Sequence, residues 1–204
     1  MSNILYKNDL PDNLDLGKSV AIDTETMGLK IKNDRLCVLQ ISSGDGNAYL
    51  VQFDNGYDFS SPNLRKILED EEVQKIFHFA RFDINVINFN FKIKIQNIFC
   101  TKIASKLVRT YSDHHGLKSL LSEILSVEIS KQQQSSYWGA DQLSKKQINY
   151  AASDVLYLHD LRDNLAKMLE KEGKLDLAKE CFKFLEIRSK LDLVGLENID
   201  IFSH

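Results

Sequence analysis

Short apolar runs separated by polar turns predict β-strands in the first part of the chain. These runs cover about residues 18–25, 36–42, 47–53 and 73–77. The turn-rich residues 43–46 join the second run to the third and predict an antiparallel hairpin. Ser61 followed by Pro62 predicts the start of a helix that ends near Glu69. Strands that alternate with helices indicate an α/β fold, in which helices flank a central sheet.

From about residue 79 onward, apolar residues recur every three or four positions, which predicts helices. The predicted helices cover about residues 79–89, 101–108, 116–125, 144–172 and 175–191. A loop at about residues 127–141 is rich in hydrogen-bond donors and aromatic residues, and a loop of that length in a compact domain is more often functional than idle. The chain ends in an apolar tail, residues 191–202, which needs a cover from its own domain or from a neighbouring subunit.

Length and composition indicate one domain, residues 1–204. The chain has 204 residues of which 43% are hydrophobic, enough for one sizeable core and too few for two. The C-terminal helix and tail, residues 175–204, are expected to pack on this domain or at an oligomer interface. No membrane-spanning run and no secretory signal are evident, and the three cysteines show no CxxC spacing, so we expect a cytoplasmic protein with reduced cysteines and no membrane.

The net charge of −3 argues against a protein that holds long nucleic acid by phosphate contacts alone. A short or end-bound nucleic acid remains open, because local patches can be basic when the total charge is not. Lys102, Lys106 and Arg109 share one face of a predicted helix. That face contacts either solvent, which is the commoner case, or a phosphate.

Two carboxylates, Asp23 and Glu25, end the first apolar run two residues apart. Side chains at that spacing in a strand lie on the same face of the sheet. Neighbouring anions repel one another, and a divalent cation screens the repulsion most strongly. Oxygen-only ligation suits Mg²⁺ or Mn²⁺. Taken alone, the pair also fits a solvated strand end.

Asp83 is the second unusual carboxylate, since it belongs to the apolar stripe of the helix predicted at residues 79–89. A buried carboxylate is costly unless a partner or a metal lies nearby. On the long helix, Tyr150 and Asp154 are four residues apart and lie beside its buried stripe. A phenol and a carboxylate so placed can reach one point in a cleft, although the pair by itself is a weak signal.

These carboxylates fall in three blocks whose order resembles that of the DEDD superfamily of 3′→5′ exonucleases. The blocks are Ile-Asp-Thr-Glu-Thr at 22–26, Phe-His-Phe-Ala-Arg-Phe-Asp-Ile at 77–84 and Tyr-Ala-Ala-Ser-Asp at 150–154. The spacing of Tyr150 and Asp154 resembles the tyrosine subclass typified by RNase D. Residues 101–107, 129–136 and 151–159 further resemble the nanoRNase C family, compact bacterial RNase D relatives that degrade very short RNA. Because only about thirty residues follow the long helix, the helical C-terminal domains of RNase D are not expected.

The resemblance implies a ribonuclease H-like fold with a mixed central sheet, and two divalent cations, Mg²⁺ or Mn²⁺. It implies that Asp23, Glu25 and Asp154 hold one ion, and that Asp23 and the scissile phosphate hold the second, which Asp83 reaches through water. Two such ions stabilise the attacking and leaving oxygens of an in-line displacement. Tyr150 would orient or deprotonate the attacking water, although a phenol with a pKa of about 10 is a poor base. The expected product is a 5′-mononucleotide.

Substrate contacts are expected from Thr24, Leu29, His78, Phe79, Ser136 and Trp138. Leu29 would wedge against bases, or else serve as a core leucine. His78 and Phe79 would touch the 3′ nucleotide, or else be structural. A 5′-phosphate contact could come from Lys102, Lys106, Arg109 or His114, between which the sequence does not choose. The resemblance further implies a homo-oligomer, a ring-like octamer in nanoRNase C, that admits short single-stranded RNA such as dinucleotides.

Two other functions remain open at this point. The same chemistry could act on longer RNA 3′ ends or on DNA. Alternatively, the chain could be a catalytically silent nucleic-acid-binding module, because a fold does not fix a function. The presence of four carboxylates together with Tyr150 favours an enzyme.

Overall fold

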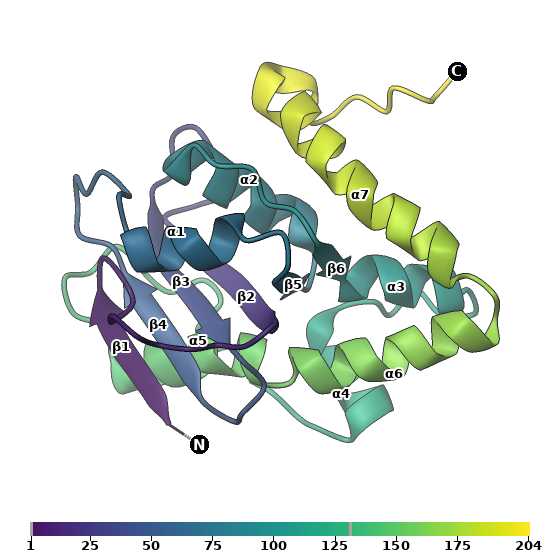
Figure 1. Cartoon of the computed structure of the whole chain (residues 1–204), viewed down its shortest axis with the longest axis horizontal. Helices are drawn as coiled ribbons and strands as arrows, with labels where there is room; N and C mark the ends of the chain where they lie inside the picture. Colours follow the sequence, from purple (N-terminus) through teal and green to yellow (C-terminus); the bar gives the residue numbers. More distant parts are fainter. Residues whose placement is uncertain (1, 131) are drawn as a thin grey trace.

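The computed structural model describes residues 2–130 and 132–204, so Met1 and Lys131 of the donor-rich loop lie outside the described residues. A six-stranded sheet forms the centre of the molecule, in the order β1-β4-β3-β2-β5-β6 (Figure 1). The strands are β1 Asn3–Lys7, β2 Ser19–Thr26, β3 Leu36–Ser42, β4 Ala48–Gln52, β5 Gln74–Phe77 and β6 Ile98–Cys100. The fold is therefore a single α/β domain, as predicted.

The sheet is mixed. β3 pairs antiparallel with β2 and with β4, which confirms the predicted hairpin, whereas β1 and β4, β2 and β5, and β5 and β6 pair in parallel. Neither β1 nor β6 was predicted from the sequence. β1 contains no buried residue, and β6 has only three residues, so neither shows the apolar pattern of an inner strand.

Seven α-helices are assigned along the described residues. They are α1 Pro62–Glu69, α2 Ala80–Phe91, α3 Thr101–Val108, α4 Leu117–Leu125, α5 Lys145–Leu156, α6 Leu158–Lys171 and α7 Leu175–Leu191. α5 packs along β1 to β4, and α2 packs against β2, β5 and β6. α3, α4 and α6 form a helical group beside the sheet, and α7 extends from that group past α2 (Figure 1).

The prediction of one long helix over residues 144–172 was wrong. The chain leaves helical geometry at Tyr157, where φ is −108° and ψ is 2°, so α5 ends at Leu156 and α6 begins at Leu158. The buried stripe continues through the break, because α5 buries Val155 against the sheet while α6 buries Leu158 and Leu161. A periodic apolar pattern reports burial on both sides of a bend and does not report the bend itself. Asp154 consequently lies in the last turn of α5.

The start of α5 anchors the donor-rich loop. Ser144 and Gln147 form a capping box, in which each side chain satisfies a backbone group at the helix start. The Gln147 amide also donates to the Ser136 hydroxyl at 3.3 Å and to the Tyr137 carbonyl at 3.1 Å. The described residues of 127–141 contain no helix or strand, as predicted. This end of the loop is therefore attached to the helix that carries Tyr150 and Asp154.

The loop after β2 has a fixed shape. Asp34 accepts a hydrogen bond from the backbone N–H of Lys30 at 2.7 Å, and a Cβ at Gly28 would lie 2.5 Å from the Asp34 carboxylate. Only glycine fits at position 28 without displacing Asp34. The loop presents Leu29 to solvent with 83% of its surface exposed, so a core role for this leucine is wrong.

The C-terminal segment continues from α7 as a short π-helical stretch, Asp192–Leu196. Beyond it, Phe202 contacts the ring of Phe184 on α7, yet Phe202 stays 78% exposed. Ile199 and Ile201 are also exposed. The apolar tail thus covers part of α7 without being covered itself. Among the described helices, none is both long and apolar enough to cross a membrane.

Candidate functional site

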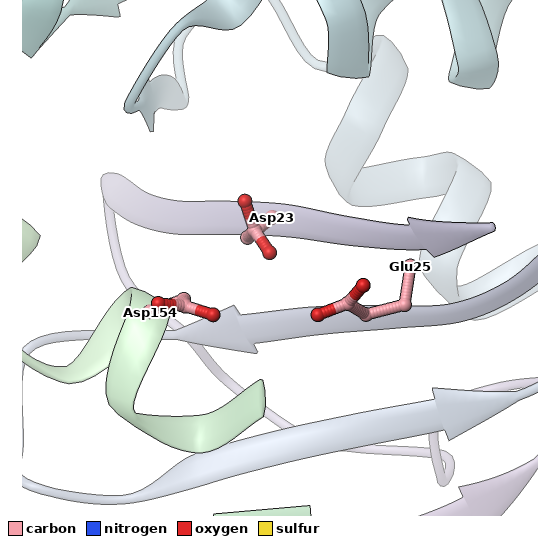
Figure 2. A group of neighbouring side chains, drawn as sticks. All are labelled: Asp23, Glu25 and Asp154. Carbon is pink, nitrogen blue, oxygen red and sulfur yellow. The ribbon is translucent and has the colours of Figure 1, made fainter. Parts of the chain in front are cut away.

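Asp23, Glu25 and Asp154 converge in space. Asp23 and Glu25 extend from the same face of β2, opposite Gln40 and Val38 of β3, and the strand register shifts directly after Glu25. Asp154 approaches them from α5, as Figure 2 shows. One carboxylate oxygen from each of the three residues lies within 4.8 Å of the others. Such a cluster can hold one cation between β2 and α5, although Glu25 and Asp154 are 129 residues apart in the sequence.

Burial holds Asp23 and Glu25 toward their protonated forms, and at Glu25 the neighbouring negative charges add to the effect. Burial raises the pKa of Asp23 to about 7. Burial first, and then the charges of Asp23, Asp154 and Asp83, raise the pKa of Glu25 to about 10. A bound divalent cation would reverse this effect, because a positive charge favours the ionised carboxylates. The oxygen-only donor set and its uncompensated charge therefore fit a hard divalent cation.

Asp83 lies on the other side of β2. Thr24, whose side chain points away from the Asp23 face, donates a hydrogen bond from its hydroxyl to the Asp83 carboxylate at 2.7 Å. Asp83 is 3% exposed, and burial together with the charge of Asp23 raises its pKa well above the usual range. Asp83 is thus close enough to sense Asp23, yet it stands outside the three-carboxylate cluster.

Tyr150 lies beside the cluster on α5. Its phenol hydrogen-bonds to Asp154, and burial together with the charges of Asp154, Glu25 and Asp23 raises its pKa. In the metal-free site the phenol is therefore protonated at neutral pH and donates this hydrogen bond. The indole of Trp138 packs against it, with ring centroids 6.1 Å apart.

The remaining expected substrate contacts differ in how far their side chains are exposed. Leu29 and Phe79 border one cavity and are exposed, whereas Trp138 is 2% exposed and packs against Tyr150. Ser136 is half-buried and accepts from Gln147. His78 is half-buried, and its Nδ1 lies 2.9 Å from the Thr101 hydroxyl.

Arg109 does not face solvent with Lys106. Its guanidinium is 2% exposed, pairs with the Glu123 carboxylate and donates to the His114 carbonyl at 2.9 Å. Arg109 joins α3 to the following turn and to α4, and is therefore not free to bind a phosphate. Helical spacing placed it on the face of Lys106, but the chain folds back over that part of the face.

Gln40 is a site residue that sequence reasoning missed. It is fully buried on β3, and its amide donates to Asp23 Oδ2 at 3.2 Å. A glutamine at the centre of the apolar run 36–42 was the available signal, because a buried polar side chain needs a partner. Gln40 orients the carboxylate of Asp23 toward the cluster.

Comparison with known proteins places the chain in a family. The sequence model of a 3′-5′ exonuclease family matches residues 7–170. A ribonuclease D of Gluconacetobacter diazotrophicus is 33% identical over 157 residues, which are 77% of this chain and 39% of that protein. A DNA polymerase I of Aquifex aeolicus is 30% identical over 86% of this chain and 29% of its own length. The chain spans about two fifths of the ribonuclease D relatives it matches.

The chain therefore belongs to the 3′-5′ exonuclease family, whose ribonuclease H-like fold it shares and whose members use divalent metal ions. A solved structure of NrnC from Brucella melitensis with bound Mg²⁺ matches with 52% identity and a TM-score of 0.94, and the match covers 100% of both chains. NrnC bound to pGG matches with 53% identity and a TM-score of 0.96 over 100% of this chain and 99% of that one. The chain is thus similar to NrnC from end to end.

Proposed function

We propose that the chain is a metal-dependent 3′→5′ exoribonuclease that degrades very short RNA, dinucleotides above all, to 5′-mononucleotides. The observation that carries this proposal is the cluster of Asp23, Glu25 and Asp154, with oxygens within 4.8 Å, on a fold that matches NrnC along its whole length. The structure of NrnC with pGG supports a short RNA as the substrate class.

Asp23, Glu25 and Asp154 would hold one Mg²⁺ or Mn²⁺, and Asp23 and Asp83 would serve a second. When bound, such ions lower the pKa of the attacking water and stabilise the charge that develops on the phosphate. Gln40 fixes one oxygen of Asp23, and Thr24 fixes one oxygen of Asp83. These hydrogen bonds preorganise the carboxylates, so that little rearrangement is needed when charge develops.

Tyr150 would orient the attacking water by a hydrogen bond. Its raised pKa keeps the phenol protonated, and its contact with Trp138 limits the positions the ring can take. Trp138 therefore serves as a positioning residue in this proposal and not as the direct substrate contact that the sequence suggested, because its indole is buried.

Leu29 and Phe79 would contact the bases, since apolar and aromatic surfaces bind bases of any sequence. His78 would contact the 3′ nucleotide. The Thr101 hydroxyl donates to the Phe77 carbonyl at 3.2 Å and therefore accepts from His78 Nδ1, which fixes the orientation of the imidazole. Ser136 is proposed as a contact with the phosphate or the ribose.

The chain is further proposed to work as a homo-oligomer, with a ring-like octamer as the expected form. The apolar residues Leu177, Phe184 and Ile187 stay exposed along α7, and the tail adds Ile199 and Phe202. Apolar surface of this extent is commonly covered by another subunit. Mass measurement of the protein in solution tests the stoichiometry.

Replacing Tyr150 by phenylalanine is expected to lower kcat about a hundredfold and to change KM and Mg²⁺ affinity less than about threefold. The ring and its contact with Trp138 remain, while the hydroxyl that orients the water is lost. Steady-state kinetics at varied substrate and metal concentrations measure all three quantities. Tyr111→Phe, which alters a phenol that is 77% exposed, is the matched control. Equal kcat values for Tyr150→Phe and the parent would remove Tyr150 from the mechanism.

The direction of hydrolysis can be tested with an RNA dinucleotide and a pentanucleotide labelled at the 5′ end. A 3′→5′ exonuclease shortens the pentanucleotide one residue at a time from the unlabelled end, and it releases 5′-mononucleotides. With the pentanucleotide, label appearing first in a mononucleotide would indicate attack from the 5′ end and contradict the proposal. The similarity to a DNA polymerase supports DNA as a second candidate substrate, so the same pentanucleotide in deoxy form belongs in the assay.

A further inference from the structure

The segment that follows α7 forms one wall of a cavity that the loop after β2 and the start of α2 also line. The cavity has a volume of about 410 Å³ and lies between the loop 29–33, the start of α2 and residues 192–197. Its loop wall begins four residues after Glu25, and its helix wall includes Phe82, the neighbour of Asp83. We refer to it as the Leu29 cavity. Figure 1 shows α7, which leads into this segment, passing beside α2.

Asp192 clamps this wall to α2. Its carboxylate is 4% exposed and accepts two hydrogen bonds from the Arg81 guanidinium, at 2.7 and 2.8 Å. It also accepts from the Asn85 amide at 2.7 Å and from Arg188 Nε at 2.8 Å. Charge-assisted bonds with bidentate geometry are among the strongest in proteins. One carboxylate thus joins the helix that carries Asp83 to the end of α7.

The same two arginines fix the backbone of the wall. Arg81 donates to the carbonyl of Glu197 at 2.6 Å, and Arg188 donates to the carbonyl of Leu196 at 2.5 Å. The opposite wall is equally fixed, because Asp34 holds the loop that carries Leu29. The cavity therefore has defined walls on both sides.

The wall lies outside the part of the chain that the exonuclease family shares. The family match ends at residue 170, whereas the match to NrnC continues through residues 192–197. The shared domain carries all four carboxylates and Tyr150, so the chemistry does not require the added wall. A segment that is added to a shared catalytic domain is well suited to select the substrate.

The lining of the Leu29 cavity suits a nucleotide. Leu29, Phe82 and Leu193 offer apolar surface for a base, and Lys30 and Lys32 supply positive charge for a phosphate. A volume of 410 Å³ lies toward the small end of the range for small-molecule sites, roughly 300–1,000 Å³. The segment 192–197 contributes Asp192, Leu193, Gly195 and Glu197 to this lining.

We propose that residues 192–197, held to α2 by Asp192, limit the substrate to a short RNA by closing the cavity that receives the nucleotide farther from the 3′ end. This inference rests on the proposed exoribonuclease function and assigns the length limit to a particular segment. Asp192 is a positioning residue in this account, and Leu193 is part of the surface that contacts the substrate.

The test compares kcat/KM for 5′-phosphorylated RNAs of two and seven nucleotides. We define the length preference as kcat/KM for the dinucleotide divided by kcat/KM for the heptanucleotide. In Asp192→Asn this ratio is expected to fall about tenfold, because the weakened clamp admits the longer RNA and holds the shorter one less well. In Leu193→Trp, which fills the cavity, KM for the dinucleotide is expected to rise about tenfold with kcat nearly unchanged. Affinities measured by calorimetry in EDTA, without any turnover, are expected to follow the same order.

Asp176→Asn is the matched control. It removes an exposed carboxylate and its ion pair with Lys179 from α7, the helix that leads into the wall. It is expected to leave the ratio unchanged. If the parent prefers dinucleotides and both Asp192→Asn and Leu193→Trp keep the parental ratio and affinities, the wall does not set the length limit, while the proposed function stands. A parent that cleaves no RNA contradicts the proposed function itself, and a parent that cleaves both lengths equally well overturns the length limit together with this inference.

Discussion

Replacing Asp154 by asparagine is expected to reduce kcat/KM at least about a thousandfold, which corresponds to roughly 4 kcal/mol of transition-state stabilisation. Asp154 supplies one of three oxygens that lie within 4.8 Å of one another, and it accepts the hydrogen bond of the Tyr150 phenol. Asparagine has nearly the same shape but carries no charge, so the cation loses an anionic ligand and the Tyr150 phenol donates to a neutral amide oxygen in place of a carboxylate. Steady-state kinetics on a dinucleotide measure the effect.

Asp160→Asn is the matched control for this variant. Asp160 is an exposed carboxylate in the first turn of α6, six residues from Asp154 and on the far side of the break at Tyr157. Its replacement is expected to change kcat/KM less than about twofold. An Asp154→Asn protein that is folded and as active as this control would show that the cluster is not the catalytic centre.

The stability of the metal-free protein is expected to fall as pH rises. Asp23 has a folded-state pKa of about 7 against an ordinary value of 3.8, and Glu25 one of about 10 against 4.5. Between the ordinary pKa and the folded-state pKa of each residue, the folded protein keeps a proton that the unfolded chain has lost. The free energy of unfolding therefore falls with each unit of pH in that range. The stabilisation is fully present below about pH 4 and is lost through pH 7 for Asp23 and toward pH 10 for Glu25.

Divalent cations are expected to remove much of this pH dependence at and above neutral pH. Mg²⁺ or Mn²⁺ at about one hundred times its dissociation constant adds roughly 2.7 kcal/mol, which raises Tm by about 5–10 °C for a chain of this size. Thermal unfolding in EDTA and in Mg²⁺, at several pH values from 5 to 9, measures both effects. Asp154→Asn in EDTA is expected to depend less on pH, because one repelling charge is gone. A Tm that changes neither with added metal nor with pH would contradict the electrostatic account of the site.

The carboxylate cluster was predictable because strand geometry and helix periodicity are local rules. Side chains two residues apart on a strand lie on the same face of the sheet. This rule placed Asp23 beside Glu25. The position of Asp83 on an apolar stripe likewise predicted its burial. Asp154 reaches these carboxylates because α5 crosses the sheet. The order of the three sequence blocks indicated this meeting, whereas the spacing within each block did not.

Features that depend on distant contacts were missed or misplaced. The break at Tyr157 leaves the apolar pattern intact, so one helix was expected where there are two. Arg109 looked solvent-facing because Glu123, its partner, lies in another helix. Asp192 looked like one acidic residue in an apolar tail, yet Arg81 meets it across 111 residues of sequence. Sequence patterns report which side chains are buried, whereas tertiary packing determines which partners they meet.

Initial rates on 5′-phosphorylated RNAs of two to ten nucleotides, measured with Mg²⁺ and with Mn²⁺, test the central claim most directly. The account predicts hydrolysis to 5′-mononucleotides only in the presence of metal, with the dinucleotide cleaved fastest and the rate falling as length increases. Equal rates across all lengths would contradict the preference for very short RNA, and no turnover with either metal would contradict the catalytic function of the cluster.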